Sequence, residues 1–89
     1  GTCYYAATNR CVEYSGYSVG SLNTTRGACR VLTGDRGWTE GGDGCSRDGE
    51  VGECTQEDGG ETEVTVFYAD TVEANRATCG SWGGSFSTP

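Results

Sequence analysis

The residues of this chain that could carry chemistry are six cysteines and thirteen carboxylates, and they occur without a single histidine or lysine. A nucleophile activated by histidine cannot be assembled from such a set, and neither can a histidine metal site or a lysine Schiff base. A carboxylate pair of the glycosidase kind needs a pocket that raises one pKa, and this chain has little apolar bulk to build one. We therefore expect no catalytic residues, no cofactor and no enzymatic activity.

The cysteines are better explained as a disulfide framework. Their spacings of 8, 18, 16, 9 and 25 residues contain no Cys-x-x-Cys pair of the kind that binds zinc. An even number of cysteines in so short a chain is typical of proteins that fold in an oxidising compartment. We expect three intrachain bridges in a secreted, extracellular or cell-surface protein. Each bridge is worth about 2–4 kcal/mol, so reduction should unfold the chain.

The charge of the chain is strongly acidic, with a net value of −7, and ten of the thirteen acidic residues lie between Asp35 and Glu63. Nucleic acids and anionic membranes require a basic face, so neither is expected as a partner. No apolar run approaches the 18 residues of a membrane-spanning helix, which excludes insertion by that route. The simplest role for the acidic residues is a solvated surface that keeps the protein soluble.

Calcium is the one metal that the acidic loops suit, with Asp43, Asp48 and Glu50 as candidate ligands. Neither the EF-hand spacing nor a series of glycine-rich calcium repeats is present. Asp43 and Asp48 each precede a glycine, which is the ordinary composition of a turn. We prefer the turn explanation and predict no metal site.

Two surface features remain as candidates. Asn23-Thr24-Thr25 is an N-glycosylation sequon, for which the alternative is an unmodified, solvated side chain. Four tyrosines on two expected neighbouring strands suggest a platform for sugars. Adjacent Tyr4 and Tyr5 must point to opposite faces, and most of these rings are expected to be structural because aliphatic residues are few. The four tyrosines are Tyr4, Tyr5, Tyr14 and Tyr17.

The elements that position these residues follow from local patterns. Aromatic and β-branched runs predict strands at 2–7 and 11–17, and Ser21 and Gly34 delimit a helix over 22–32. Residues 34–49 are expected to form a loop around an anchored Trp38. Strands at 51–56 and 61–68 flank a hairpin turn that contains Asp-Gly. The spacing of Asp70 and Glu73 predicts a second helix that ends near Gly80, and the tail is expected to add a last strand.

These elements predict a small, disulfide-rich α+β fold in which two short helices pack on an antiparallel sheet. The whole chain, 1–89, forms one domain, with two similar halves at about 11–45 and 54–86. Six cysteines allow fifteen pairings, so spacing alone does not choose among them. Equivalent positions in the two halves favour Cys11–Cys29 and Cys54–Cys79, which leaves Cys3–Cys45.

A series of framework motifs runs through about residues 11–86. In these motifs the chain resembles a group of small secreted or lipid-anchored bacterial proteins of unassigned function. The resemblance implies secretion and supplies no catalytic residue. The motifs are Cys11-Val-Glu-Tyr14-Ser-Gly16, Ala28-Cys29, Gly37-Trp38, Cys45, Val51-Gly-Glu-Cys54, Phe67-Tyr68 and Cys79-Gly-Ser-Trp82.

Two functions of different class are compatible with these observations. In the first, the protein is an extracellular structural subunit that assembles with copies of itself into a filament or surface coat and carries covalent glycans. In the second, it is a monomeric secreted binding module for a glycan, a protein or calcium. Such a module would use the acidic loop 35–63 or the tyrosine face. The sequence favours the first, since both ends have strand character and an unpaired strand edge can template a neighbouring chain.

Overall fold

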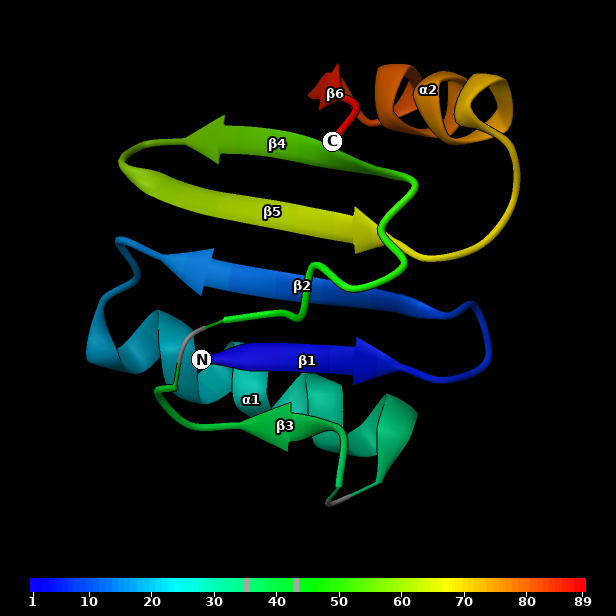
Figure 1. Ribbon diagram of the computed structural model, residues 1–89. Helices are drawn as coiled ribbons and strands as arrows, with labels where there is room; N and C mark the ends of the chain where they lie inside the picture. The colour runs from blue at the N-terminus through cyan, green and yellow to red at the C-terminus, as the bar shows by residue number, and fades with distance from the viewer. Residues whose placement is uncertain (35, 43) are drawn as a thin grey trace.

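A computed structural model describes residues 1–34, 36–42 and 44–89. It contains two α-helices and six β-strands, and it confirms the predicted disulfide-rich α+β fold (Figure 1). In chain order the elements are β1 (Thr2–Tyr5), β2 (Arg10–Ser15), α1 (Val19–Thr33), β3 (Trp38–Thr39), β4 (Gly52–Asp58), β5 (Glu61–Phe67), α2 (Val72–Ser81) and β6 (Ser85–Ser87).

The six strands form one antiparallel sheet in the order β3-β1-β2-β5-β4-β6. This order is symmetric about the boundary between β2 and β5. On each side of it lies one unit made of a hairpin, a helix and a short strand that pairs with the first strand of the hairpin (Figure 1). The units span 2–39 and 52–87. The halves expected from the sequence, at about 11–45 and 54–86, differ from these units chiefly because the first of them omits β1.

The strand register assigns both helices to the same face of the sheet. A single row of directly opposed residues crosses all six strands, and directly opposed residues share a face. Disulfides join two members of this row to the helices, Cys3 to Cys29 of α1 and Cys54 to Cys79 of α2. The row consists of Trp38, Cys3, Val12, Thr65, Cys54 and Phe86.

The disulfide connectivity corrects two of the expected bridges. The structure pairs Cys3 with Cys29 and Cys11 with Cys45, in place of Cys11–Cys29 and Cys3–Cys45, whereas Cys54 pairs with Cys79. The reason is the pleat. Cys11 precedes Val12 in β2 and so points to the face away from the helices. Cys3 of β1 lies beneath α1, and it is Cys3 that is equivalent to Cys54 of β4.

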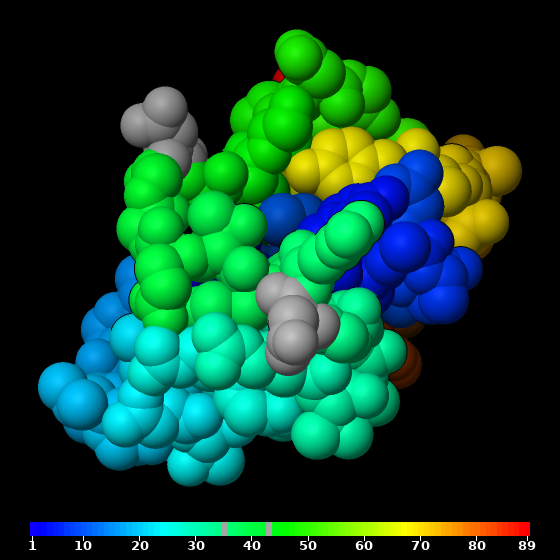
Figure 2. Space-filling model, turned by 90° about the horizontal axis from the view of Figure 1, so that it is seen from below, coloured from blue at the N-terminus to red at the C-terminus, as the bar shows by residue number. Residues whose placement is uncertain are grey.

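The opposite face of the sheet is covered by the connection between the two units, residues 40–51, of which Asp43 lies outside the described residues. Cys45 ties this connection to the centre of the sheet through Cys11. Figure 2 shows α1 in cyan on one side of the molecule and the green connection rising to the other side. The protein therefore has three layers, with helices on one face of the sheet and a stapled loop on the other.

Each disulfide lies at the centre of a separate small core. Cys3 and Cys29 pack with Trp38, Cys11 and Cys45 with Val66, and Cys54 and Cys79 with Phe67. The chain contains only seven valines, two leucines and no isoleucine. Because so few aliphatic side chains are available, the bridges supply both covalent constraint and buried bulk.

The helix ends follow local capping chemistry, with shifts from the predicted positions. The N-cap of α1 is Ser18, whose hydroxyl accepts from the backbone N–H of Ser21, so the helix begins earlier than Ser21 suggested. Gly34 ends α1 as expected, with φ of 76°. Thr71 caps α2 in place of Asp70, and the helix continues through Gly80 to a C-cap at Trp82.

The hairpin between β4 and β5 closes with a turn of two glycines. Its two turn residues are Gly59 and Gly60, with φ of 57° and 88°. Two consecutive positive φ values suit the tight turn of a twisted hairpin, and glycine adopts them without a steric cost. The turn lies one residue later than the predicted Asp-Gly pair, because β4 continues to Asp58.

Neither of the two described helices is long and apolar enough to cross a membrane. Three disulfides are the mark of a protein of an oxidising environment such as the extracellular space.

Candidate functional site

The helical face of the sheet carries a groove along its two central strands. The packed helices cover the outer strands, α1 on β1 and β3 and α2 on β4 and β6, and leave β2 and β5 between them. The floor of this interhelical groove is the central pair Val12 and Thr65, both buried. The hollow has a volume of about 320 Å³. Its lining residues are Tyr5, Val12, Tyr14, Gln56, Glu63, Thr65 and Trp82.

One wall of the groove consists of tyrosine rings that rest on the core beneath α1. Tyr14 stacks on the buried Trp38 with ring centroids 5.8 Å apart, and Tyr17 meets Tyr14 edge to face at 5.5 Å. Tyr5 packs against the same core cluster. Tyr4 lies on the opposite face, as the alternation of the strand requires. Three of the four candidate tyrosines therefore lie together, Tyr5 and Tyr14 in the groove wall and Tyr17 beside them.

The other wall is built around Trp82, which follows α2. Its ring stacks on buried Phe67 at a centroid distance of 6.0 Å, and its backbone carbonyl accepts from the Gln56 side-chain amide at 3.3 Å. The guanidinium of Arg10 lies 5.7 Å from the Trp82 ring centroid and 5.1 Å from that of Phe67. Trp82 nevertheless remains 39% exposed, whereas the second tryptophan, Trp38, is 8% exposed. An accessible indole therefore faces the tyrosine wall across the groove.

The groove continues into a second hollow at the hairpin end of the sheet, with a volume of about 410 Å³. We call this hollow the acidic end. It shares Gln56, Glu63 and Trp82 with the interhelical groove, and it is further lined by Tyr17, Glu57, Asp58, Glu61 and Gly83. Strand alternation points Asp58 to the groove face with Gln56, and Glu57 to the opposite face. The two hollows form one channel whose walls are aromatic and whose open end is anionic.

Burial and hydrogen bonding keep Tyr14 and Tyr17 protonated. The Tyr17 hydroxyl donates to Glu63 Oε1 at 2.9 Å. Burial raises the pKa of Tyr17, and the hydrogen bond and the charge of Glu63 raise it further. Burial also raises the pKa of Tyr14, with an added contribution from the neighbouring Tyr5. Both phenols therefore stay protonated and serve as hydrogen-bond donors and apolar surfaces rather than as bases.

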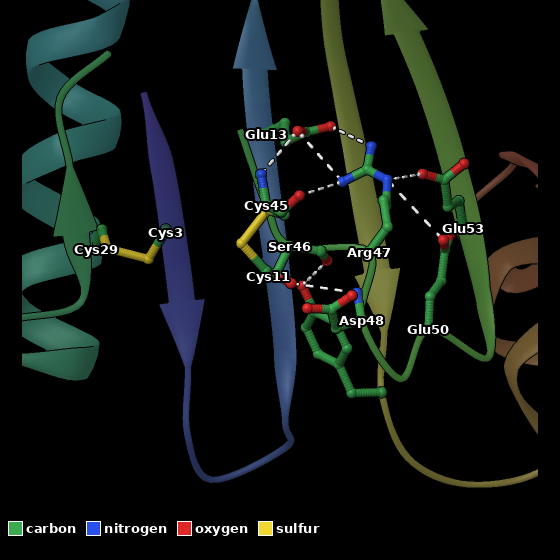
Figure 3. The surroundings of a disulfide bond; sticks show 11 residues. Cys3, Cys11, Glu13, Cys29, Cys45, Ser46, Arg47, Asp48, Glu50 and Glu53 are labelled. Carbon is green, nitrogen blue, oxygen red and sulfur yellow. Dashed lines mark hydrogen bonds and ion pairs between the residues drawn. A yellow bond between two sulfur atoms is a disulfide. The ribbon is translucent and has the colours of Figure 1, made fainter. Parts of the chain in front are cut away.

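On the opposite face, Arg47 organises the connection through three carboxylates. Its guanidinium lies 2.8 Å from Glu13 and 2.7 Å from Glu53, with Glu50 at 3.9 Å (Figure 3). Glu13 also accepts from the backbone N–H of Cys45 at 2.8 Å. Burial raises the pKa of Glu13, but these hydrogen bonds and the charge of Arg47 outweigh burial and leave the pKa below its ordinary value. This network holds the connection in place beside the Cys11–Cys45 bridge.

Two of the three candidate calcium ligands, Asp48 and Glu50, lie in the described residues, and they have different surroundings. Burial and the charge of Glu53 raise the pKa of Glu50, whose side chain faces Arg47. Asp48 lies in an exposed turn, where its backbone N–H donates to the hydroxyl of Ser46 (Figure 3). Asp43 lies outside the described residues. In the ranges 1–34, 36–42 and 44–89, no three acidic or cysteine side chains are arranged to hold a metal ion.

Asn23 lies on the exposed surface of α1, inside the helix rather than at its start. Its side-chain oxygen accepts a hydrogen bond from Arg26, which also pairs with Glu40. The sequon is therefore accessible in the folded protein.

The acidic loop 35–63, expected to act as one unit, is divided by the fold. Glu50 of the connection and Glu53 of β4 face Arg47, whereas Asp58, Glu61 and Glu63 of the β4–β5 hairpin line the acidic end on the other face of the sheet. Sequence reasoning singled out the tyrosines but missed the groove residues Trp82, Gln56 and Glu63. A signal existed for Glu63, because in the strand predicted at 61–68 it alternates onto the same face as Thr65 and Phe67. No local signal brings Trp82 to Tyr14, since the pairing of β2 with β5 does that.

No protein-family model, curated protein or solved structure matches this chain.

Proposed function

We propose that this protein is a non-catalytic extracellular binding module that holds an extended ligand in the interhelical groove. The observation that carries the proposal is the exposure of aromatic surface there. A chain with so little apolar bulk leaves the Trp82 indole 39% exposed opposite a tyrosine wall, instead of using it to enlarge a core. Aromatic side chains with a few convergent polar groups are the usual lining of a ligand site.

The disulfides support the same proposal, because they fix the walls of the groove in advance. Cys3–Cys29 holds α1 to β1, and Cys54–Cys79 holds α2 to β4. A preformed groove loses less conformational entropy when a ligand binds. Histidine, lysine and a free thiol are absent, so the groove offers hydrogen bonds and ring surfaces but no activated nucleophile. In this proposal the ligand leaves chemically unchanged.

The two tryptophans provide a direct test by ¹⁵N-labelled NMR. Pools of short peptides and of oligosaccharides are titrated into the protein, and the two indole N–H signals are followed separately. Binding in the groove shifts the signal of Trp82, while that of buried Trp38 stays in place. Trp82→Ala lacks this reporter, so its binding is followed through the backbone amides of Val12 and Thr65 on the groove floor, and it should be weaker than that of the wild type. If no pool moves Trp82, or if Trp38 and residues of the opposite face move instead, the groove is not the binding site. Mass spectrometry of the recovered ligand checks that it is unaltered.

Self-assembly is a second candidate, favoured by the two ends of the sheet. Within the described residues, β3 and β6 each pair on one side only, and they lie at opposite edges. Contact between unlike edges propagates into a fibre when the rotation does not close. Near the β3 edge, α1 also exposes Val31 and Leu32, at 85% and 72%. The edges are only two and three residues long, however, so strand addition there supplies few hydrogen bonds.

Microscopy and mass measurements separate these alternatives. A filament subunit gives fibres by negative-stain microscopy and a mass that rises with concentration in light scattering, and Leu32→Glu should reduce both. A constant monomer mass up to millimolar concentration rules the assembly out. Glycosylation belongs to the same proposal, with Asn23 as its site. Intact mass before and after enzymatic deglycosylation of the secreted protein tests it, and an unmodified mass refutes it.

A further inference from the structure

We infer that the occupant of the groove is an extended peptide segment that carries arginine or lysine side chains. This inference rests on the proposed binding role of the groove and adds the chemistry of the ligand. It follows from three properties of the acidic end, namely its unneutralised charge, its exposed aromatic rings and its continuity with the groove.

The carboxylates on the two faces of the sheet differ in their partners. On the opposite face, Glu13, Glu50 and Glu53 are all within ion-pair distance of Arg47. The acidic end has three carboxylates on the groove face, and in the described ranges none of them lies within ion-pair distance of an arginine. They belong to Asp58, Glu61 and Glu63, the last of which accepts a hydrogen bond from Tyr17. This set is therefore available to pair with a cationic ligand.

The aromatic rings at the same place suit a cation as well. Trp82 and Tyr17 line the acidic end together with the carboxylates. A guanidinium or ammonium over an indole is stabilised by the ring quadrupole, and tryptophan is the strongest ring in this respect. The protein already makes this contact with its own Arg10, whose guanidinium lies 5.7 Å from the Trp82 ring centroid. A ligand cation at the acidic end would contact the accessible part of the same ring and face Glu63.

The shape of the channel favours a peptide over a single cation. The acidic end and the interhelical groove share Gln56, Glu63 and Trp82, so a ligand anchored by a basic side chain can continue over Val12 and Thr65. Along that floor Gln56 offers an amide donor and acceptor to a peptide backbone. Hydroxyl groups of a neutral glycan can donate to these carboxylates but do not neutralise their charge, and an anionic chain would be repelled.

The test uses four synthetic heptapeptides and the oxidised chain 1–89. The probes are Ac-GGRGRGG-NH₂, its lysine counterpart, its citrulline counterpart and Ac-GGEGEGG-NH₂. Citrulline keeps the shape and hydrogen bonding of arginine without its charge. We expect the arginine and lysine peptides to shift the indole signal of Trp82 but not that of Trp38. Binding should weaken severalfold, on the order of 3–10 times, between 50 and 300 mM NaCl, because salt screens exposed charges.

Two double variants with the same change in charge locate the effect. Asp58→Asn with Glu61→Gln removes two charges from the acidic end, and affinity for the arginine peptide should fall about tenfold, as expected for the loss of close charge pairs. Asp70→Asn with Glu73→Gln removes one aspartate and one glutamate charge from exposed positions outside the channel. That control should change affinity less than about twofold, since screened charges contribute little. Trp82→Ala should lower affinity roughly 3–30-fold.

The outcomes separate this inference from the proposal on which it rests. If the citrulline or glutamate peptide, or an uncharged oligosaccharide, shifts Trp82 as strongly as the arginine peptide, the ligand is not cationic and only the groove proposal survives. Equal losses in the two double variants also overturn the inference, because net charge rather than the acidic end would then control binding. If no probe of any class shifts Trp82, both are refuted.

Discussion

Removal of the Cys11–Cys45 bridge should destabilise the protein through its unfolded state. The two cysteines are 34 residues apart in the sequence. In the chain-entropy treatment, a loop of that size contributes about 3.8 kcal/mol to stability at 25 °C. Cys3–Cys29 already closes part of the same loop, which lowers the contribution to about 3.4 kcal/mol. Loss of two buried sulfur atoms beside Val66 adds roughly 1 kcal/mol, because apolar surface is lost from a small core.

The expected loss for Cys11→Ala with Cys45→Ala is therefore about 4 kcal/mol. For a domain of this size that corresponds to a fall in melting temperature of about 15–30 °C. Urea unfolding and calorimetry at pH 7 measure both quantities. The matched control is Cys54→Ala with Cys79→Ala, whose shorter separation of 25 residues gives about 3.5 kcal/mol before packing losses. A loss below about 1.5 kcal/mol for the first pair would refute the reasoning, since the bridge would then neither close a long loop nor support a core.

Three further predictions follow from the same structure. Because each cysteine lies in a different tryptic peptide, mass spectrometry without reduction should find three pairs of disulfide-linked peptides. A link from peptide 11–26 to peptide 27–30 would disprove the connectivity. Arg47→Met should cost about 2 kcal/mol at pH 7, because partly buried carboxylates lose their cation. Because the pKa of Glu13 is lowered in the folded protein, its ion pair with Arg47 stabilises the fold above the ordinary carboxyl pKa of 4.5, and this stabilisation is lost as the pH falls below it. In urea unfolding, the difference in stability between the wild type and Arg47→Met should therefore shrink towards pH 3 and not persist there. Gly52→Ala should destabilise by about 1–3 kcal/mol, because a β-carbon there would clash with the Phe86 ring. Gly27→Ala, in open space on α1, should instead stabilise by up to about 1 kcal/mol, and melting curves showing equal effects would contradict this contrast. The expected pairs are 1–10 with 27–30, 11–26 with 37–47, and 48–76 with 77–89.

The disulfides show where local and long-range information divide. The number and spacing of the cysteines were enough to predict a stapled fold, because a chain with two leucines and no isoleucine has few other sources of stability. The pairing was not predictable from the same information. Whether Cys3 or Cys11 reaches Cys29 depends on which strand lies beneath α1, and that is decided when β3 adds to β1. Because neighbouring positions in a strand point to opposite faces, Cys11 then points to the face that the connection covers.

The groove shows the same division at the functional site. The sequence by itself determined the α+β class, the hairpin turn, the helices and the alternation that separates Tyr4 from Tyr5, since each depends on residues a few positions apart. Only the tertiary structure decided that Tyr14 and Trp82 form opposite walls. They are brought together because β2 of one unit pairs with β5 of the other, and because the disulfides hold a helix on each side of that pair. Such contacts depend on the register and packing of whole elements, which no local pattern of residues encodes.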